Sequence, residues 1–322
     1  MIDGVSFIIP VYNGERTIKA CIKSALAQTW KGETEVIVVD DASADRTLNI
    51  LLPLPVTIIT GGKNVGAAAA TNVGMKRAKY EIVVSLDSDA VLKKDWLEKI
   101  LPRFDAPEVG AVAGYIATGN TSIMGRLAGY HLEWQMEHGA IFQNQLSTTN
   151  TAYRASLLKE VGYFNESMRI GYDVDMSHRI KRAGYTLILE NDARCTHFWK
   201  DTLWGYLKQE YNYGLYNAEN LSEEMVKTAP SMVFQGLITG VVLMIAGIDL
   251  FLLACGNHAV NGLFMLLVLS ALPLFYLPEG ISVWKKKKEW AVVLLPFLLA
   301  LRNIMRLMAF GVGTIQKLRR GV

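Results

Sequence analysis

The feature that most constrains the fold is an alternation of strand-like and helix-like patterns in the N-terminal third of the chain. The runs "VSFIIPVY", "TEVIVVDD", "VTIIT" and "EIVVSLDSDA" have the composition and length of buried strands. The segments between them carry helical patterns, as in "TIKACIKSALAQTW", where apolar residues recur at Ile18, Ile22 and Leu26. The alternation predicts an α/β fold with a twisted, mostly parallel sheet and flanking helices.

Polar side chains follow three of the predicted strands. They are Tyr12 and Asn13, Asp40 and Asp41, and Asp87, Ser88 and Asp89. Ligands of such sheets bind outside the carboxyl ends of the strands, so we expect these residues to share one site. No G-x-G-x-x-G follows the first strand and no P-loop is present, which argues against a dinucleotide-binding fold and a P-loop nucleotidase.

The "DSD" at residues 87–89 suggests a metal site. Two carboxylates separated by one residue can share a hard cation, and Mg²⁺ and Mn²⁺ prefer oxygen ligands and often bridge carboxylates to substrate phosphates. A solvated turn is the alternative for such a short motif. The position of Asp87 and Asp89 directly after a buried strand favours the metal site.

The second acidic pair and the glycine-rich segment after it leave two alternatives each. Asp41 accepts hydrogen bonds from a ligand's base N–H, or Asp41 or Ser43 caps a helix that begins near Ala44. In "GGKNVGAAAATNVG" the alanines allow close approach to a ligand or tight packing on the sheet. Lys63 and Asn64 are the candidates there for contacts with phosphate or sugar.

Long apolar runs fill the chain from Pro230 onward and raise the mean hydropathy to +0.21. Met232–Ala254 and Val260–Trp284 are each long enough to cross a bilayer, with a short link that predicts a hairpin. Lys285–Lys288 follow at once and favour the cytoplasmic face. Two spans return the chain to its starting side, so we expect a multi-pass cell-membrane protein with a cytoplasmic N-terminal domain.

A third apolar segment, residues 291–313, carries Arg302 and Arg306 in its middle. An arginine at mid-bilayer costs at least about 2.5 kcal/mol on insertion scales, so a broken, re-entrant or interfacial helix is the alternative to a span. We expect Asp249, in the first span, to face one of these arginines. The transmembrane domain, residues 230–322, is then expected to hold two to four helices.

The segment before the first span, Trp204–Asn220, is rich in Trp and Tyr, which favour the headgroup level of a membrane. It predicts an interfacial helical region at residues 201–229, after a cytoplasmic domain at residues 1–200. The membrane region is either a simple anchor or also shapes a groove for a lipid-borne ligand, and membrane lipids are expected partners in both cases.

Charge and cysteine content exclude other classes. The net charge of +3, without a basic stripe interleaved with aromatics, argues against nucleic-acid binding. Cys21, Cys195 and Cys255 lack metal spacing and are expected to be reduced and buried. The N-terminus lacks the pattern of a signal peptide.

Six segments in order, from about Val5 to His197, resemble the successive motifs of glycosyltransferase family 2, the inverting, metal-dependent GT-A enzymes. They are "FIIPVYNGERTI", "VIVVDDASADRT", "NVGAAAATNVGMKRA", "EIVVSLDSDAVLKKDWLE", "NTAYRASLLKEVGYFNE" and "DVDMSHRIKRAGY". The resemblance implies a GT-A fold, a nucleotide-sugar donor and a Mn²⁺ or Mg²⁺ cofactor.

The resemblance also implies roles for individual residues. Those expected to contact the donor nucleotide are Pro10, Tyr12, Glu15, Asp41, Lys63 and Asp87. Asp89 is expected to hold the metal, with Asp87, and Asp173 matches the catalytic base. His197 matches a position that approaches the metal or the diphosphate in part of the family, with a structural histidine as the alternative. Arg154 meets a phosphate or pairs with an acid.

The chain departs from the family pattern at two places. Tyr172 stands where most members have an acid before the base. The Q-x-x-R-W signature of processive synthases is replaced by Gln209–Tyr213, "QEYNY", in which Gln209 and Tyr213 are candidate acceptor contacts.

The replaced signature and the small number of predicted spans favour transfer of one sugar, from GDP-mannose or a UDP-hexose such as UDP-glucose. The base-like Asp173 favours a hydroxyl of a lipid-linked saccharide or glycolipid as the acceptor. The alternatives are a polyprenyl-phosphate sugar synthase, a processive synthase and a nucleotide-binding scaffold without activity.

Overall fold

The computed structural model describes residues 2–138, 145–220, 240 and 272–319. The chain divides into two compact units: Met1–Gly119 with Gln135–Phe198, and Asn120–Trp134 with Trp199–Val322. Each unit is described by itself. The second unit therefore includes residues 120–134, which the sequence patterns do not separate from the first.

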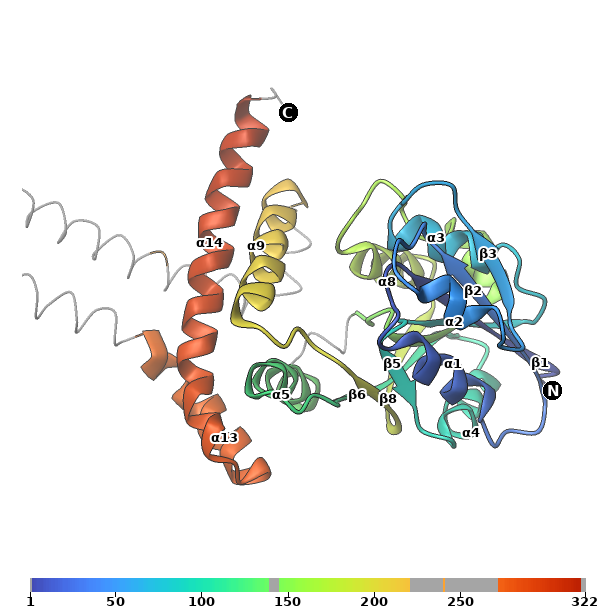
Figure 1. Cartoon of the computed structure of the whole chain (residues 1–322), viewed down its shortest axis with the longest axis horizontal. Coiled ribbons are helices and arrows are strands. Elements are labelled where there is room, and N and C mark those ends of the chain that lie inside the picture. Colours follow the sequence, from blue (N-terminus) through green and yellow to red (C-terminus); the bar gives the residue numbers. More distant parts are fainter. Residues whose placement is uncertain (1, 139–144, 221–239, 241–271, 320–322) are drawn as a thin grey trace, which may run out of the picture. The chain divides into compact units, whose positions relative to one another are not determined.

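The first unit is built on an eight-stranded sheet with the order β3-β2-β1-β4-β7-β6-β8-β5 (Figure 1). The strands are β1 (Gly4–Val11), β2 (Glu33–Asp40), β3 (Thr57–Thr60), β4 (Ile82–Leu86), β5 (Ala90–Leu92), β6 (Val109–Thr118), β7 (Asn150–Arg154) and β8 (Thr186–His197). Strands β3, β2, β1 and β4 are mutually parallel, as the alternating pattern predicts. Strand β7 runs antiparallel to both its neighbours, so the whole sheet is mixed.

Short helices connect these strands. They are α1 (Ile18–Leu26), α2 (Thr47–Leu51), α3 (Ala67–Met75), α4 (Trp96–Ile100), the 3₁₀ helix η1 (Leu101–Asp105), α7 (Ala155–Val161) and α8 (Tyr172–Arg182). A Cβ at Gly74 of α3 would lie 2.4 Å from Ile8, and Ala68 and Ala70 belong to the buried core. The small residues of α3 therefore serve close packing on the sheet.

Ala42, in the loop after β2, has a φ of +63°, in the left-handed region that favours glycine. We expect Ala42→Gly to raise the free energy of unfolding by about 1 kcal/mol, because it removes this strain. Thermal unfolding of the purified chain measures the change. Ala44→Gly, two residues on and outside the positive-φ positions, is the matched control and should destabilise or have no effect; equal shifts in both variants would contradict the prediction.

The second unit is helical. It contains residues 123–134 of α5 (Ile123–His138), α9 (Leu203–Asn220), α13 (Leu277–Lys287), the 3₁₀ helix η2 (Trp290–Leu294) and α14 (Leu295–Arg319). Apart from Gly240, the first predicted span lies outside the described residues, as do Asp249 and Cys255. The last residues of the second predicted span form part of α13, a helix with a buried Glu279 and exposed Ile281 and Trp284.

Helices α9 and α14 pack against each other through small residues (Figure 1). A Cβ at Gly214 of α9 would lie 2.3 Å from the Arg306 carbonyl oxygen and 2.7 Å from Ala309 Cβ. A Cβ at Gly313 would likewise lie 2.7 Å from Ala218 Cβ. Each helix thus contributes two small residues four positions apart, a spacing that permits close backbone approach.

Gly214→Ala should lower the free energy of unfolding by about 1–3 kcal/mol, because the new methyl group meets backbone rather than a flexible side chain. Gly311→Ala is the matched control, since nothing lies within 4 Å of a Cβ there, and it should be neutral or stabilising. Equal unfolding temperatures for the two variants would contradict close packing at Gly214.

The two arginines of the third apolar segment face polar partners inside the second unit. Arg306 Nε lies 2.5 Å from a carboxylate oxygen of Glu210 on α9. Arg302 is buried and contacts the ring of His131, whose other ring nitrogen lies 2.5 Å from Glu279. Arg306 is therefore paired with Glu210 on α9, and Arg302 contacts a histidine that in turn meets Glu279 on α13. Asp249 lies outside the described residues, so its expected contact with one of these arginines stays a prediction.

Within the described ranges, one helical stretch is long and apolar enough to cross a membrane, Trp290–Arg319, with a mean hydropathy of 1.8 and half of its apolar window buried. The core helix of a soluble protein can have the same length and composition as this stretch, so these two properties alone do not establish that it enters a membrane.

Candidate functional site

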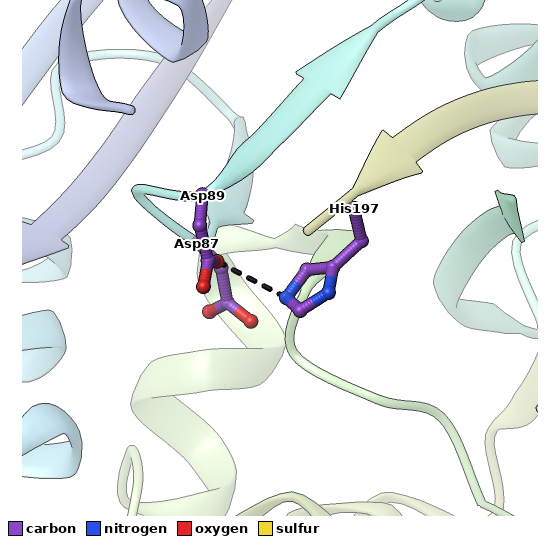
Figure 2. Close-up of side chains that lie close together, drawn as sticks. All are labelled: Asp87, Asp89 and His197. Carbon is purple, nitrogen blue, oxygen red and sulfur yellow. Dashed lines mark ion pairs between the residues drawn. The ribbon is translucent and has the colours of Figure 1, made fainter. Parts of the chain in front are cut away.

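Three candidate metal ligands converge where β4 and β8 end (Figure 2). Asp87 and Asp89 lie in the short turn from β4 to β5, and the end of β8 places His197 opposite Ala90. The backbone N–H of Phe198 donates to the Asp89 carbonyl at 3.3 Å, which fixes the end of β8 beside the turn. One ligand atom from each of the three residues lies within 4.8 Å of the others, and His197 Nε2 is 3.0 Å from Asp89 Oδ1.

The electrostatics of this cluster suit a divalent cation. Burial, then the charge of Asp89 and, as a smaller cause, the charge of Asp173 together raise the pKa of Asp87 to about 6. Carboxylates that repel one another in this way are stabilised by a bound cation. Two carboxylate oxygens and one imidazole nitrogen are donors that Mn²⁺ and Mg²⁺ accept, so the residues fit the predicted metal.

Two residues that the sequence patterns did not assign to the site, Thr149 and Cys21, hold the Asp87 turn. The Asp87 N–H donates to the Thr149 carbonyl at 3.0 Å, and the Thr149 hydroxyl hydrogen-bonds the Asp87 carboxylate. From the other side, the Cys21 thiol donates to the Asp87 carbonyl at 3.3 Å. Burial and the nearby carboxylates raise the pKa of Cys21, so it remains a protonated donor. No local pattern marks either residue, because the contacts arise only when β4 lies beside β7 and α1.

Asp173 lies in the first turn of α8, after Gly171, whose φ is +76°. Burial raises its pKa, and one carboxylate oxygen accepts the Val174 N–H at 2.9 Å. Its charge raises the pKa of both Asp87 and Tyr153, which places its carboxylate near the metal cluster. Asp173 thus reaches the same end of the sheet as Asp87 and Asp89.

Ordinary helix contacts surround Asp173 on α8. Asp175 pairs with Arg179 at 2.7 Å, four residues on, and Gly184 follows the helix with a φ of +88°. Tyr172, the departure from the family pattern, packs its ring edge-on against Phe164 with centroids 5.4 Å apart. Tyr172 is therefore part of the packing under α8.

Asp41 organises the loop between β3 and α3. Its carboxylate accepts the N–H groups of Val65 and Gly66 at 2.8 and 2.9 Å, and its carbonyl accepts the Asn64 amide at 3.3 Å. The alternative in which Asp41 or Ser43 caps a helix at Ala44 is wrong, because α2 begins at Thr47. Asp41 therefore fixes the loop that carries the exposed Lys63.

The remaining nucleotide candidates lie at the end of β1. Pro10 is in the strand, and Tyr12 follows it with 53% of its surface exposed. Glu15 accepts from the Arg46 side chain at 3.2 Å, which ties this loop to the one after β2. The ends of β1, β2 and β4 thus lie along one edge, as the three strand ends predict.

Three further candidates lie elsewhere. The Arg154 guanidinium donates to the carbonyls of Phe104, Ala106 and Val109 at 2.6–3.0 Å, so its donors are engaged in holding the start of β6 rather than paired with an acid. Gln209 and Tyr213 belong to the second unit, where the Gln209 amide donates to the Tyr213 hydroxyl at 3.2 Å.

The family model for glycosyl transferase family 2 matches residues 6–162, a range that contains Asp41, Asp87 and Asp89. The chain carries a glycosyl transferase family 2 domain. The resemblance seen in the motifs is thereby confirmed, and Asp173 and His197 follow the matched range.

Curated relatives and a solved structure agree with this family. The poly-β-1,6-N-acetyl-D-glucosamine synthase of Staphylococcus epidermidis is 30% identical over 226 residues, 66% of this chain and 54% of the relative. The enzyme of the same name from Staphylococcus aureus strain COL is 28% identical over 241 residues, 70% and 58% of the two chains. The chain therefore spans just over half the length of these relatives.

The mannosyltransferase PcManGT from Pyrobaculum calidifontis, solved with GDP-Man and Mn²⁺, aligns over 93% of this chain and 86% of its own, with 20% identity and a TM-score of 0.58. This likeness shows the fold, and the mixed α/β fold is that of GT-A glycosyltransferases.

Proposed function

We propose that this chain is a membrane-bound inverting glycosyltransferase that moves one sugar from a nucleotide-sugar to a hydroxyl of a lipid-linked saccharide or glycolipid. The observation that carries the proposal is the cluster of Asp87, Asp89 and His197 with the Asp173 carboxylate nearby. A metal-binding set and a separate carboxylate are the two groups that direct glycosyl transfer from a nucleoside diphosphate requires.

In this proposal Asp173 is the general base. It accepts the proton of the acceptor hydroxyl as that oxygen bonds to the anomeric carbon, while the bond from the same carbon to the diphosphate breaks on the opposite face. The configuration at the anomeric carbon is inverted, and the electron pair of the broken bond leaves with the nucleoside diphosphate. Asp87, Asp89 and His197 would hold Mn²⁺ or Mg²⁺, which would compensate the charge of the departing diphosphate.

The donor is proposed from the site and its relatives together. GDP-mannose and UDP-hexoses remain the candidates, with the GDP-Man and Mn²⁺ of PcManGT supporting the first and the N-acetylglucosamine polymer synthases supporting a UDP-linked sugar. The loop that Asp41 fixes, with Lys63, and the end of β1 with Pro10, Tyr12 and Glu15 are proposed to bind the nucleotide.

A processive synthase is the second candidate, because the relatives named above are polymer synthases. Against it stands "QEYNY", in which Asn212 and Tyr213 replace the arginine and tryptophan of the processive signature. Gln209 and Tyr213 are proposed acceptor contacts in either case. A phosphate acceptor needs no base, so the base-like setting of Asp173 favours a hydroxyl acceptor over a polyprenyl phosphate.

Release of UDP or GDP tests the proposal. The full chain is incubated with Mn²⁺, a membrane lipid extract and, in turn, GDP-mannose, UDP-glucose and UDP-N-acetylglucosamine. We expect one donor to be consumed and its lipid product to gain a single sugar by mass spectrometry. A ladder of products would establish the processive alternative, and no release from any donor would support the scaffold instead.

Membrane attachment is part of the proposal. Its support is the apolar stretch Trp290–Arg319, in which Arg302 and Arg306 face polar partners. The apolar side chains of Phe297, Met308 and Ile315 are exposed. We place the catalytic domain on the cytoplasmic side, where nucleotide-sugars are expected, in agreement with the lysines that precede this stretch.

A further inference from the structure

The start of the apolar stretch carries a surface that combines lysines with exposed tryptophans. We define it as the lysine–tryptophan surface: Trp284, Lys285, Lys286, Lys288 and Trp290. The three lysines are exposed, and Trp284 and Trp290 expose 47% and 69% of their surface. Exposed apolar side chains that are rimmed by charged residues mark protein or membrane interaction sites, so the surface is a candidate for such a site.

Contacts on the inner side of α13 explain why this surface faces outward. Glu279 is buried beside His131, and Lys287 turns inward to Glu133 at 2.6 Å and lies over the Tyr130 ring. These contacts fix the rotation of α13. One of the four consecutive lysines is therefore part of the helical packing, and the other three are presented outside it.

Apolar residues continue the surface on both sides. Helix α13 exposes Leu277 and Ile281 at helical spacing with Trp284, and Lys288 lies over the Trp284 ring at 5.2 Å. The exposed side chains that follow Trp290 are Val293, Leu294 and Phe297. A face with apolar residues, two tryptophans and a row of lysines has the composition of a segment lying at a membrane interface.

We propose that the lysine–tryptophan surface binds the headgroups of anionic phospholipids. The lysines immediately precede Trp290, the first residue of the stretch that qualifies as a span, so they lie at headgroup level when that stretch enters the bilayer. Charge complementarity selects the occupant, because each lysine near an anionic leaflet adds to the attraction. The inference rests on the membrane attachment proposed above, and adds that the surface prefers anionic to uncharged lipid headgroups.

The test uses the full chain in nanodiscs of equal parts phosphatidylglycerol and phosphatidylcholine. Bromines, which quench tryptophan, are placed on the acyl chains of one lipid or of the other, so the overall composition never changes. The tryptophan fluorescence of the double variant Trp284→Phe/Trp290→Phe is subtracted from that of the unaltered chain. The difference comes from the two tryptophans of the surface alone. We expect brominated phosphatidylglycerol to quench this part of the fluorescence about threefold more than brominated phosphatidylcholine.

A lysine variant and a matched control decide the cause. Lys285→Gln/Lys286→Gln/Lys288→Gln should make quenching by the two lipids nearly equal. Lys19→Gln/Lys23→Gln/Lys31→Gln, which removes three exposed lysines of the first unit, should leave the preference intact. Equal quenching by both lipids in the unaltered chain, or a preference that survives the lysine variant, would overturn the proposal and leave an acidic protein or no partner at this surface.

Quenching requires no donor and no turnover, so it is independent of the proposed reaction. A chain with the lipid preference but no release of UDP or GDP would contradict the transferase and keep the surface. A chain that releases nucleotide in detergent but is quenched equally by the two brominated lipids would support the transferase and contradict lipid binding by the lysine–tryptophan surface.

Discussion

Asp173→Asn should lower kcat about a thousandfold while the chain still binds its nucleotide-sugar. The amide cannot accept the proton of the acceptor hydroxyl, and loss of a general base commonly removes a factor of about 10² to 10⁴. The substitution keeps the size of the side chain in the first turn of α8, so the packing of Tyr172 on Phe164 is preserved. Steady-state release of UDP or GDP measures kcat, and calorimetry with donor and Mn²⁺ measures binding.

Asp175→Asn is the matched control for this variant. It removes an aspartate two residues further along the same helix, and its salt bridge to Arg179 is partly exposed and worth about 0.5 kcal/mol. Activity near that of the unaltered chain is expected. If Asp173→Asn turns over as fast as Asp175→Asn with donor bound, the base assignment is wrong and an ionised acceptor such as a phosphate is favoured.

The pH dependence of the unaltered chain should report the same group. The base works when it is deprotonated, and burial raises the pKa of Asp173 above that of an ordinary aspartate. Activity should therefore fall as the pH falls through this raised pKa, so its acidic limb lies above the usual aspartate range of about 4. An acidic limb at or below that range, in a pH profile of kcat, would contradict a buried base.

The parallel half of the sheet can be predicted from the sequence, because the patterns that indicate its strands and helices lie within short stretches of the chain. Apolar runs of strand length alternate with helical patterns, and short connections make the consecutive strands β1, β2 and β3 neighbours. The antiparallel β7 and the pairing of β5 with β8 do not follow, because these short strands meet partners far along the chain. The sequence of β7, "NTAYR", contains no local pattern that predicts its position between β4 and β6.

The candidate site divides in the same way. Asp87 and Asp89 could be predicted from the strand before them, whereas His197 and Asp173 were named only through the family motifs. Cys21 was expected to be buried and reduced, as it is, but the support that Cys21 and Thr149 give to Asp87 could not be predicted, because it arises only through tertiary contact. The arginines of α14 show the same limit, since their partners Glu210 and His131 come from other helices.

Asp89→Asn should raise the Mn²⁺ concentration needed for half-maximal activity at least about a hundredfold. The neutral amide loses the charge that attracts the cation, and changes in the mere surroundings of a metal already cost about 10- to 100-fold in affinity. Asp89 is chosen because its carboxylate lies beside His197 and raises the pKa of Asp87, so it is central to the cluster. Removing metal with a chelator should abolish nucleotide release, and Mn²⁺ should restore it in the unaltered chain at far lower concentration than in the variant.

His197→Gln separates the two roles left open for the histidine. A metal ligand, when replaced, shifts the Mn²⁺ requirement, whereas a purely structural histidine lowers the unfolding temperature and leaves that requirement unchanged. The ligand role is expected, because Nε2 of His197 lies 3.0 Å from Oδ1 of Asp89, and one ligand atom from each of Asp87, Asp89 and His197 lies within 4.8 Å of the others. Asp95→Asn, which breaks an ion pair with Lys99 on α4 away from the cluster, is the control and should not alter the metal dependence. A Mn²⁺ requirement that is the same in Asp89→Asn, His197→Gln and Asp95→Asn would show that these residues hold no metal.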